Sequence, residues 1–164
     1  MNRWARIQIA IAAIGTALLL VTFRQGFAVA VQPSSFPLHT QLALVATLLL
    51  LLGWLWVIVY LLGARRRLAA RGGLDASELR SVDRSARGAL VAALLAAAAV
   101  VAHVLVAGRL FARPGSGEIH LRSAVVTVAI QAVALVVCAR GLARHQGLLE
   151  AKKRVGRVLD SAGS

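Results

Sequence analysis

The chain has 164 residues, of which 59% are hydrophobic, and its mean hydropathy is +0.78. Soluble domains contain about 45–50% apolar residues, so this composition excludes a water-soluble fold. The formal net charge is +13, but the cations lie almost entirely between apolar runs, which argues against a nucleic-acid partner. A single cysteine, Cys138, excludes an internal disulfide and a multi-cysteine metal site.

The first apolar run follows a short basic start and predicts a membrane-spanning helix over residues 7–31. Arg24 interrupts this run near its outer end, where a long side chain can carry its charge to the membrane surface. A cleaved signal peptide is the alternative, because Ala28-Val29-Ala30 resembles a cleavage site. The uncharged stretch from Ile7 to Phe23 is longer than the roughly 7–15 apolar residues of a signal peptide, and this favours the span.

The second run, Leu38 to Gly63, carries no formal charge and predicts a span over residues 38–63. A helix rises about 1.5 Å per residue and bilayer hydrocarbon is about 30 Å thick, so this run crosses with room for tilt. Aromatic residues lie in its second half and arginines follow it, namely Trp54, Trp56, Tyr60 and Arg65 to Arg67. Since aromatic rings and cations favour the headgroup layer, we expect the span to end there, on the cytoplasmic side.

Two further runs predict a third span over residues 88–110 and a fourth over residues 119–140. Pro33 and Pro37 predict a tight turn between the first two spans, because proline interrupts the hydrogen bonding of a helix. The sequence therefore predicts an all-α fold, an integral membrane four-helix bundle formed by residues 1–141.

Positive charge is unevenly divided between the two ends of these spans. In this arrangement both termini and the segment from Ala64 to Arg87 lie on one side of the membrane. That side carries 15 of the 19 Lys and Arg, and the other side carries four. Because cytoplasmic loops carry the excess of Lys and Arg, we expect both termini in the cytoplasm and the protein in a bacterial inner membrane. In the same segment Asp75 and Glu78 have the spacing of a capping box, which predicts a helix beginning near Ala76.

Residues 142–164 form a basic tail, for which we expect an amphipathic helix lying on the inner membrane surface. The residues predicted to contact lipid headgroups are Lys152, Lys153, Arg154 and Arg157. Apolar residues lie roughly opposite them at helical spacing, namely Leu148, Val155, Val158 and Leu159. Each cation near an anionic membrane surface contributes about 1 kcal/mol, so anionic headgroups account for much of the charge without a nucleic-acid partner.

Polar and small residues inside a membrane mark the helix faces that contact protein, since lipid-facing positions are apolar. On the fourth span such residues share one face, namely His120, Ser123, Thr127, Gln131 and Cys138. On the third span the corresponding face carries Ala92, Ala96, Ala99 and His103. We therefore expect Ser123, Thr127 and Gln131 to pack against these alanines, with Gln131 in an interhelical hydrogen bond.

Three of the four histidines fall near the outer ends of the spans. His39 opens the second span, His120 opens the fourth, and helical rise places His103 about 7–8 Å below the outer surface. Two imidazoles on facing helices at equal depth suit the ligation of haem b, and neutral histidine also binds copper or zinc. The candidate cofactor-binding residues are therefore His39, His103 and His120, although no cofactor is firmly implied, because an interfacial histidine can also cap a helix or contact water.

Catalytic patterns are not evident in the sequence. The predicted spans contain no Asp or Glu, and no nucleophile with an adjacent base or phosphate-binding glycine loop can be identified. A proton-coupled transporter would ordinarily show an intramembrane carboxylate or paired repeats. We therefore expect a protein that is not an enzyme.

Several features between Leu38 and Arg157 together resemble a known family. They are Gly53-Trp54 in a leucine-rich span, the arginine run after it, His103 shortly before Gly108, the Arg113-Pro114-Gly115-Ser116-Gly117 turn, and Ala143-Arg144-His145. In this order of features the chain is similar to small bacterial multi-span membrane proteins implicated in cytochrome oxidase maturation. The resemblance implies a role in handling haem. The family's pattern also has histidines after the arginine run and within the fourth span, and it has a fifth crossing. This chain has neither of those histidines, carries Gln131 in the fourth span, and has no fifth apolar run.

Three functional hypotheses follow from the sequence. The first is a non-enzymatic subunit or accessory protein of a bacterial membrane complex, respiratory complexes included, that packs against other membrane subunits or copies of itself. The second is a membrane protein that binds haem b or a metal ion through the outer-side histidines. The third is a transporter of a small solute along the face that carries Gln131.

Overall fold

The computed structural model describes residues 3–71, 76–110 and 117–162, which form long α-helices joined in part by a short 3₁₀ turn. The helices are α1 (Arg3–Val31), α2 (Phe36–Arg71), α3 (Ala76–Leu110) and α4 (Gly117–Ala162), and the turn is η1 (Pro33–Ser35). No β-strand occurs within these described ranges. Each predicted span lies inside one of the helices, so the prediction of an all-helical fold is confirmed.

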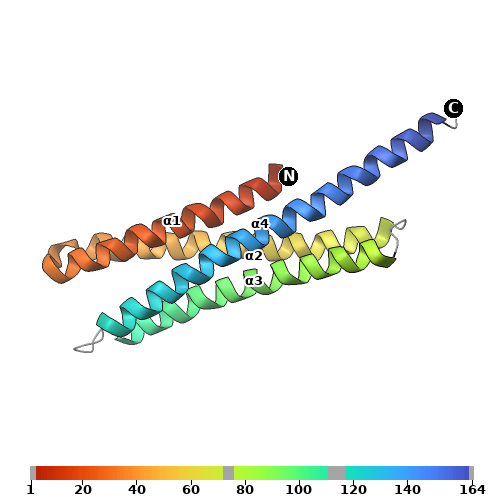
Figure 1. Cartoon of the computed structure of the whole chain (residues 1–164). Helices are drawn as coiled ribbons and strands as arrows, with labels where there is room; N and C mark the ends of the chain where they lie inside the picture. The colour runs from red at the N-terminus through yellow and green to blue at the C-terminus, as the bar shows by residue number, and fades with distance from the viewer. Residues whose placement is uncertain (1–2, 72–75, 111–116, 163–164) are drawn as a thin grey trace.

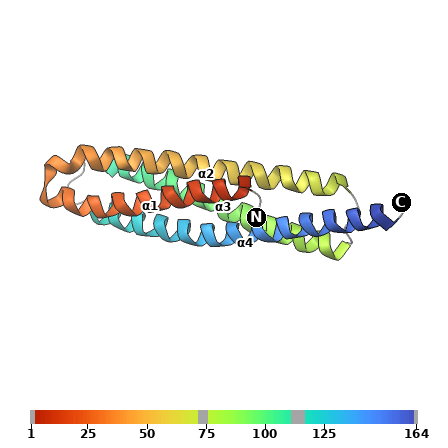
Figure 2. The same cartoon turned by 90° about the horizontal axis from the view of Figure 1, so that it is seen from above.

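The helices lie side by side in an elongated bundle in which consecutive helices run in opposite directions (Figure 1; Figure 2). α1 packs on α2, α2 on α3 and α3 on α4, and contacts between α1 and α4 close the ring. The turn between α1 and α2 marks one end, which we call the histidine end because it contains His39, His103 and His120. The start of α3 marks the other, which we call the arginine end because it contains Arg66, Arg84 and Arg144.

Glycine brings α1 and α2 into close contact. A Cβ atom on Gly53 of α2 would lie 3.0 Å from the backbone nitrogen of Ala12, and one on Gly15 of α1 would lie 2.9 Å from Leu50 Cγ. These separations are shorter than ordinary van der Waals contacts, so a side chain at either position would require neighbouring atoms to shift. Small residues commonly mark contacts between membrane helices, because close backbone approach increases van der Waals packing.

Large aliphatic side chains cover the outside of the bundle, whereas much of its interior is alanine. In α3, Ala89 and Ala96 are fully buried, while Leu95 and Leu105 are 59% and 60% exposed. A surface of this kind suits hydrocarbon and would be a large apolar patch in water. By length and composition, four stretches can cross a membrane, namely Arg6–Val29, Phe36–Gly63, Asp83–Ala107 and Glu118–Arg144. The fold thus has the form expected of a multi-pass membrane protein.

α4 passes residue 142, where we expected the basic tail to begin, as one helix. α4 continues without a break to Ala162 and extends past the other helices at the arginine end (Figure 1). Leu142 is fully buried, and the buried Gln146 donates through Nε2 to the Tyr60 hydroxyl of α2 at 3.1 Å. The bundle therefore includes at least one more turn of α4, because Leu142 and Gln146 continue the inward-facing spacing beyond Arg140.

The connections agree only partly with the sequence-based expectations. α3 begins at Ala76, as the capping pattern predicts, while Asp75 itself lies outside the described residues. Pro37, which we expected in the turn, instead lies in the first turn of α2. A proline is tolerated there because the first N–H groups of a helix have no partner within the helix.

Candidate functional site

The centre of the bundle contains a fully buried amide side chain, Gln131 of α4. Its Oε1 accepts a hydrogen bond from Trp54 Nε1 of α2 at 2.6 Å, and its Nε2 donates to the Ala96 carbonyl oxygen of α3 at 2.8 Å. One side chain therefore joins three helices. Because a polar group in an apolar interior costs free energy unless it is hydrogen-bonded, these two bonds favour one arrangement of α2, α3 and α4.

The remaining polar face of α4 also lies against α3. The Thr127 hydroxyl is 2.8 Å from the Ser123 carbonyl oxygen, one turn back, and 3.4 Å from the Ala99 carbonyl oxygen of α3. Further along, Cys138 Sγ is 3.2 Å from the Ala89 carbonyl oxygen, to which it donates. Thr127 and Cys138 are both buried. These contacts follow the face of α4 that the sequence assigns to helix packing.

The structure corrects the position expected for Trp54. The sequence suggested a ring at the headgroup layer, but the indole is fully buried and hydrogen-bonded to Gln131. Trp56, by contrast, is 49% exposed. Leu50 and Val57 are also fully buried, so the inward face of α2 repeats at intervals of three and four residues. Apolar residues also occupy the other faces of α2, so the sequence does not show which face points inward.

The histidine end brings the three candidate histidines together from α2, α3 and α4. The ring centroids of His103 and His120 are 5.1 Å apart, and the rings are stacked with 23° between their planes. The ring centroids of His39 and His120 are 6.4 Å apart, with 77° between the planes. The similar depth inferred from the sequence therefore corresponds to a cluster of imidazoles, with His120 adjacent to the other two.

Two of these rings are oriented by hydrogen bonds through Nδ1. His39 Nδ1 lies 3.1 Å from the Thr22 carbonyl oxygen, which can only accept, so Nδ1 carries the proton of the neutral ring. His103 Nδ1 lies 3.0 Å from Ser123 Oγ, whose own proton is donated to the His120 carbonyl oxygen at 2.8 Å. The neutral His103 ring is therefore also protonated on Nδ1, which leaves the lone pairs of His39 and His103 on Nε2. His120 Nδ1 is buried without a hydrogen-bond partner.

These features give the cluster suitable donor atoms for a metal ion. An imidazole that donates from one nitrogen and ligates through the other is the usual arrangement of a metal-binding histidine. Zinc–nitrogen bonds are about 2.0–2.1 Å long, so centroid separations of 5.1 and 6.4 Å allow two rings to reach one ion. Among the described residues, however, no group of three or more His, Cys, Asp or Glu is already arranged to hold a metal. Ligation by the cluster would therefore require a ring to rotate.

Haem ligation by the stacked pair fits less well. The lone pair of an imidazole nitrogen lies in the plane of the ring, and both axial ligands of a haem must aim at the iron from opposite sides. His103 and His120 instead present their faces to each other. In this arrangement the cluster suits a small ion better than a porphyrin.

The arginine end contains the cations predicted to contact lipid and a second polar group that the sequence analysis missed. Lys152, Lys153, Arg154 and Arg157 belong to the last part of α4, and their side chains lie outside the described part of the structure. The missed group lines a cavity between α3 and α4 and consists of Ser77, Arg80, Ser81, Arg84, Ser85 and Arg144. Its sequence signal is serine repeating every four residues, which continues the inward face of α3 toward its start.

Comparison with known proteins gave no match to a family model, a curated protein or a solved structure. The resemblance to oxidase-maturation proteins therefore rests on the sequence features given above.

Proposed function

We propose that this protein is an integral protein of a bacterial inner membrane that crosses the bilayer four times with both termini in the cytoplasm. Two observations support the proposal. The exposed surface of the four apolar helices is covered by large aliphatic side chains. The excess of Lys and Arg lies at the arginine end, as the rule for cytoplasmic loops predicts.

Cysteine labelling tests this orientation. Ser34→Cys lies in the turn at the histidine end, and Arg66→Cys lies on α2 at the arginine end, with both positions exposed. In intact spheroplasts an impermeant maleimide should label the Ser34 variant and should reach the Arg66 variant only after permeabilisation. The native Cys138 is buried and provides the background measurement. The reverse pattern would exclude the proposed orientation.

The function that the geometry supports best is that of a non-enzymatic accessory subunit that acts through helix packing. The observation that carries it is the closed polar interior, in which both polar groups of Gln131 are bonded to neighbouring helices. An amide engaged in this way holds helices together and does not favour a solute path along this face, the third hypothesis from the sequence. The outer face of α1 offers a surface for a partner, because Ala10, Ala13 and Ala17 are exposed at the spacing used in contacts between membrane helices.

Extraction from native membranes in a mild detergent, followed by size analysis and identification of associated chains, tests the accessory role. We expect an assembly larger than one chain. Ala13→Phe should dissociate it, because a large ring prevents close approach to α1, whereas Ala98→Phe on the exposed side of α3 should not. A single chain recovered from native membranes under these conditions would contradict the proposal.

A second candidate function, the binding of haem b or a metal ion, is favoured by the histidine cluster. The specific observation is the anchoring of two Nδ1 atoms beside His120, whose own Nδ1 is buried without a partner. Protein purified from native membranes should then contain copper or zinc by elemental analysis, or show a Soret absorption band if haem is bound. His120→Ala should remove the signal and His145→Ala should retain it. A colourless, metal-free preparation of the unaltered protein would eliminate this function.

A further inference from the structure

The face of α3 that packs on α4 continues past the apolar part of the bundle. In the middle of α3 this face carries buried alanines, among them Ala89 and Ala96. Toward the start of α3 it carries serine at every fourth position, namely Ser85, Ser81 and Ser77. A four-residue step keeps side chains on nearly one side of a helix, so the serines extend the same contact face.

The close contact between α4 and this face of α3 ends near Gly141. A Cβ atom on Gly141 would lie 2.9 Å from Ala89 Cβ and 3.4 Å from the Ser85 carbonyl oxygen, so the two helices are in close contact there. A Cβ atom on Gly147 would meet nothing within 4 Å. Figure 1 shows α4 separating from the start of α3 beyond this contact, and a cavity of about 520 Å³ lies between the two helices.

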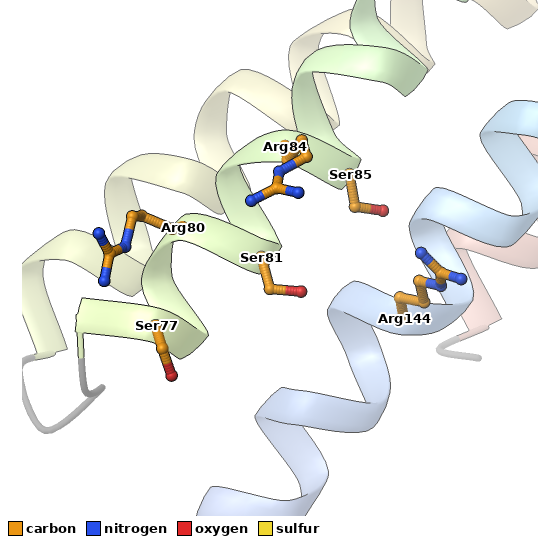
Figure 3. A pocket seen from close by; sticks show the side chains of 6 residues that line it. All are labelled: Ser77, Arg80, Ser81, Arg84, Ser85 and Arg144. Carbon is orange, nitrogen blue, oxygen red and sulfur yellow. The ribbon is translucent and has the colours of Figure 1, made fainter.

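Arginine and serine side chains, which donate hydrogen bonds, line this cavity. Figure 3 shows the serine side chains on the side of α3 toward α4, Arg144 on the neighbouring stretch of α4, and the Arg80 side chain pointing away from α4. Arg80 and Arg84 each precede one of the serines on α3. Among the residues whose side chains the structure describes, the lining of the cavity thus combines serine hydroxyls and arginines from two helices, with Arg84 on α3 and Arg144 on α4.

Arg84 and Arg144 of the cavity differ from two other arginines of the bundle in their carboxylate partners. Arg87 lies 3.6 Å from the Asp83 carboxylate, and Arg122 pairs with Glu118. Within the described ranges, neither Arg84 nor Arg144 has a carboxylate partner. Like charges that share a cavity repel one another, and a bound anion would remove that repulsion.

We propose that this cleft between α3 and α4 binds a phosphate group. Guanidinium groups bind phosphate through paired hydrogen bonds, and hydroxyls donate to the remaining oxygens. A phosphate group has more acceptor oxygens than a carboxylate. It can therefore accept hydrogen bonds from donors on both α3 and α4. The volume exceeds what the phosphate needs and leaves room for the group attached to it.

Two sources can supply this phosphate, a phospholipid headgroup and a free phosphate anion. The apolar stretch of α3 begins at Asp83 and that of α4 ends at Arg144, so the cleft lies at the border of both stretches. The lipid source rests on the proposed membrane insertion, because that border would then lie among headgroups. Binding of free phosphate to the purified protein does not depend on insertion.

Titration of delipidated protein in a neutral detergent distinguishes the two sources. Native mass spectrometry would measure binding of phosphatidylglycerol, and calorimetry would measure binding of inorganic phosphate with acetate as the carboxylate control. Each of Arg84→Gln and Arg144→Gln should weaken phosphate binding about tenfold, since charge-assisted hydrogen bonds are lost. The double variant Ser81→Ala and Ser85→Ala, which leaves the charge unchanged, should weaken it severalfold.

Two controls separate a built site from general attraction to a basic surface. Arg66→Gln removes an exposed cation from α2 at the same end, and Arg122→Gln removes one at the opposite end. Neither should change binding. Lipid binding that depends on the cleft variants identifies a headgroup site, and the same dependence for inorganic phosphate alone identifies a soluble ligand. Equal weakening in all arginine variants, an unchanged serine double variant, or no binding of either probe would overturn the proposal. These results are independent of the labelling that tests insertion.

Discussion

The contact between α3 and α4 is closed along its middle and open at the arginine end, although one continuous face of α3 serves both regions. In the middle, that face carries alanine and α4 presents Thr127, Gln131 and Cys138. At the arginine end, it carries serine and α4 presents Arg144 across a cavity. The spacing of the face is the same in both. Periodicity therefore determines which side of a helix points inward, while the size and charge of the side chains determine whether the helices meet.

The largest change in the free energy of unfolding is expected from removing the Gln131 amide, which joins the helices in the middle of the α3–α4 contact. Gln131→Ala leaves a cavity and a buried Trp54 N–H without an acceptor, and should lower the free energy of unfolding by about 3 kcal/mol. Unfolding in detergent, followed by tryptophan fluorescence, would measure the loss. Gln41→Ala on the exposed side of α2 is the control, with an expected change below about 0.5 kcal/mol. Equal losses in the two variants would show that Gln131 does not hold the closed region together.

The boundary between the closed and open regions can be tested with two glycines of α4. Gly141→Ala introduces a Cβ 2.9 Å from Ala89 Cβ, and should destabilise the protein by about 1–3 kcal/mol because the helices must move apart. Gly147→Ala meets nothing within 4 Å and should stabilise it by about 0.5–1 kcal/mol, since alanine favours the helix. Thermal unfolding of both variants in one detergent gives the comparison. Changes of the same sign would contradict close packing of α4 on α3 at Gly141.

The fold was largely predictable because its signals are local and strong. Apolar runs long enough to cross hydrocarbon fix the number of helices, and the step from Asp75 to Glu78 correctly predicted the start of α3 at Ala76. The burial of Leu142 and Gln146 was not predicted, because the arginines after Val137 suggested that the membrane part had ended. A helix does not stop where its hydropathy falls, and Leu142 and Gln146 keep the inward spacing.

The candidate site was predictable where one helix face carries the signal. The polar face of α4 could be assigned to packing because polar side chains in an apolar run recur at helical spacing. The partnership of Gln131 with Trp54 could not, because the two residues are 77 positions apart and the choice between lipid interface and core depends on how α2 is rotated. The cleft at the arginine end was missed for a related reason, since it exists only because α4 diverges from α3.

The smallest change in the free energy of unfolding is expected from removing the Thr127 hydroxyl, whose contact with α3 is long. The Thr127 hydroxyl bonds mainly to its own helix, at 2.8 Å, and lies 3.4 Å from the Ala99 carbonyl oxygen of α3. Thr127→Val should therefore cost about 0.6 kcal/mol, the average for a hydrogen bond within a membrane protein. Thr22→Val in α1 is a matched control, because this buried hydroxyl bonds at 2.8 Å to the Leu18 carbonyl oxygen of its own helix.

Unfolding measurements of the two threonine variants should give the same loss within error. That result would assign the closure of the α3–α4 contact to Gln131 and to the small size of the facing alanines, with little contribution from the hydroxyl. A loss for Thr127→Val larger than that for Thr22→Val by more than about 1 kcal/mol would give the Ala99 contact a substantial share. The closed region would then depend on a row of polar contacts along α4, and the exchange of alanine for serine on α3 would not by itself explain why the arginine end is open.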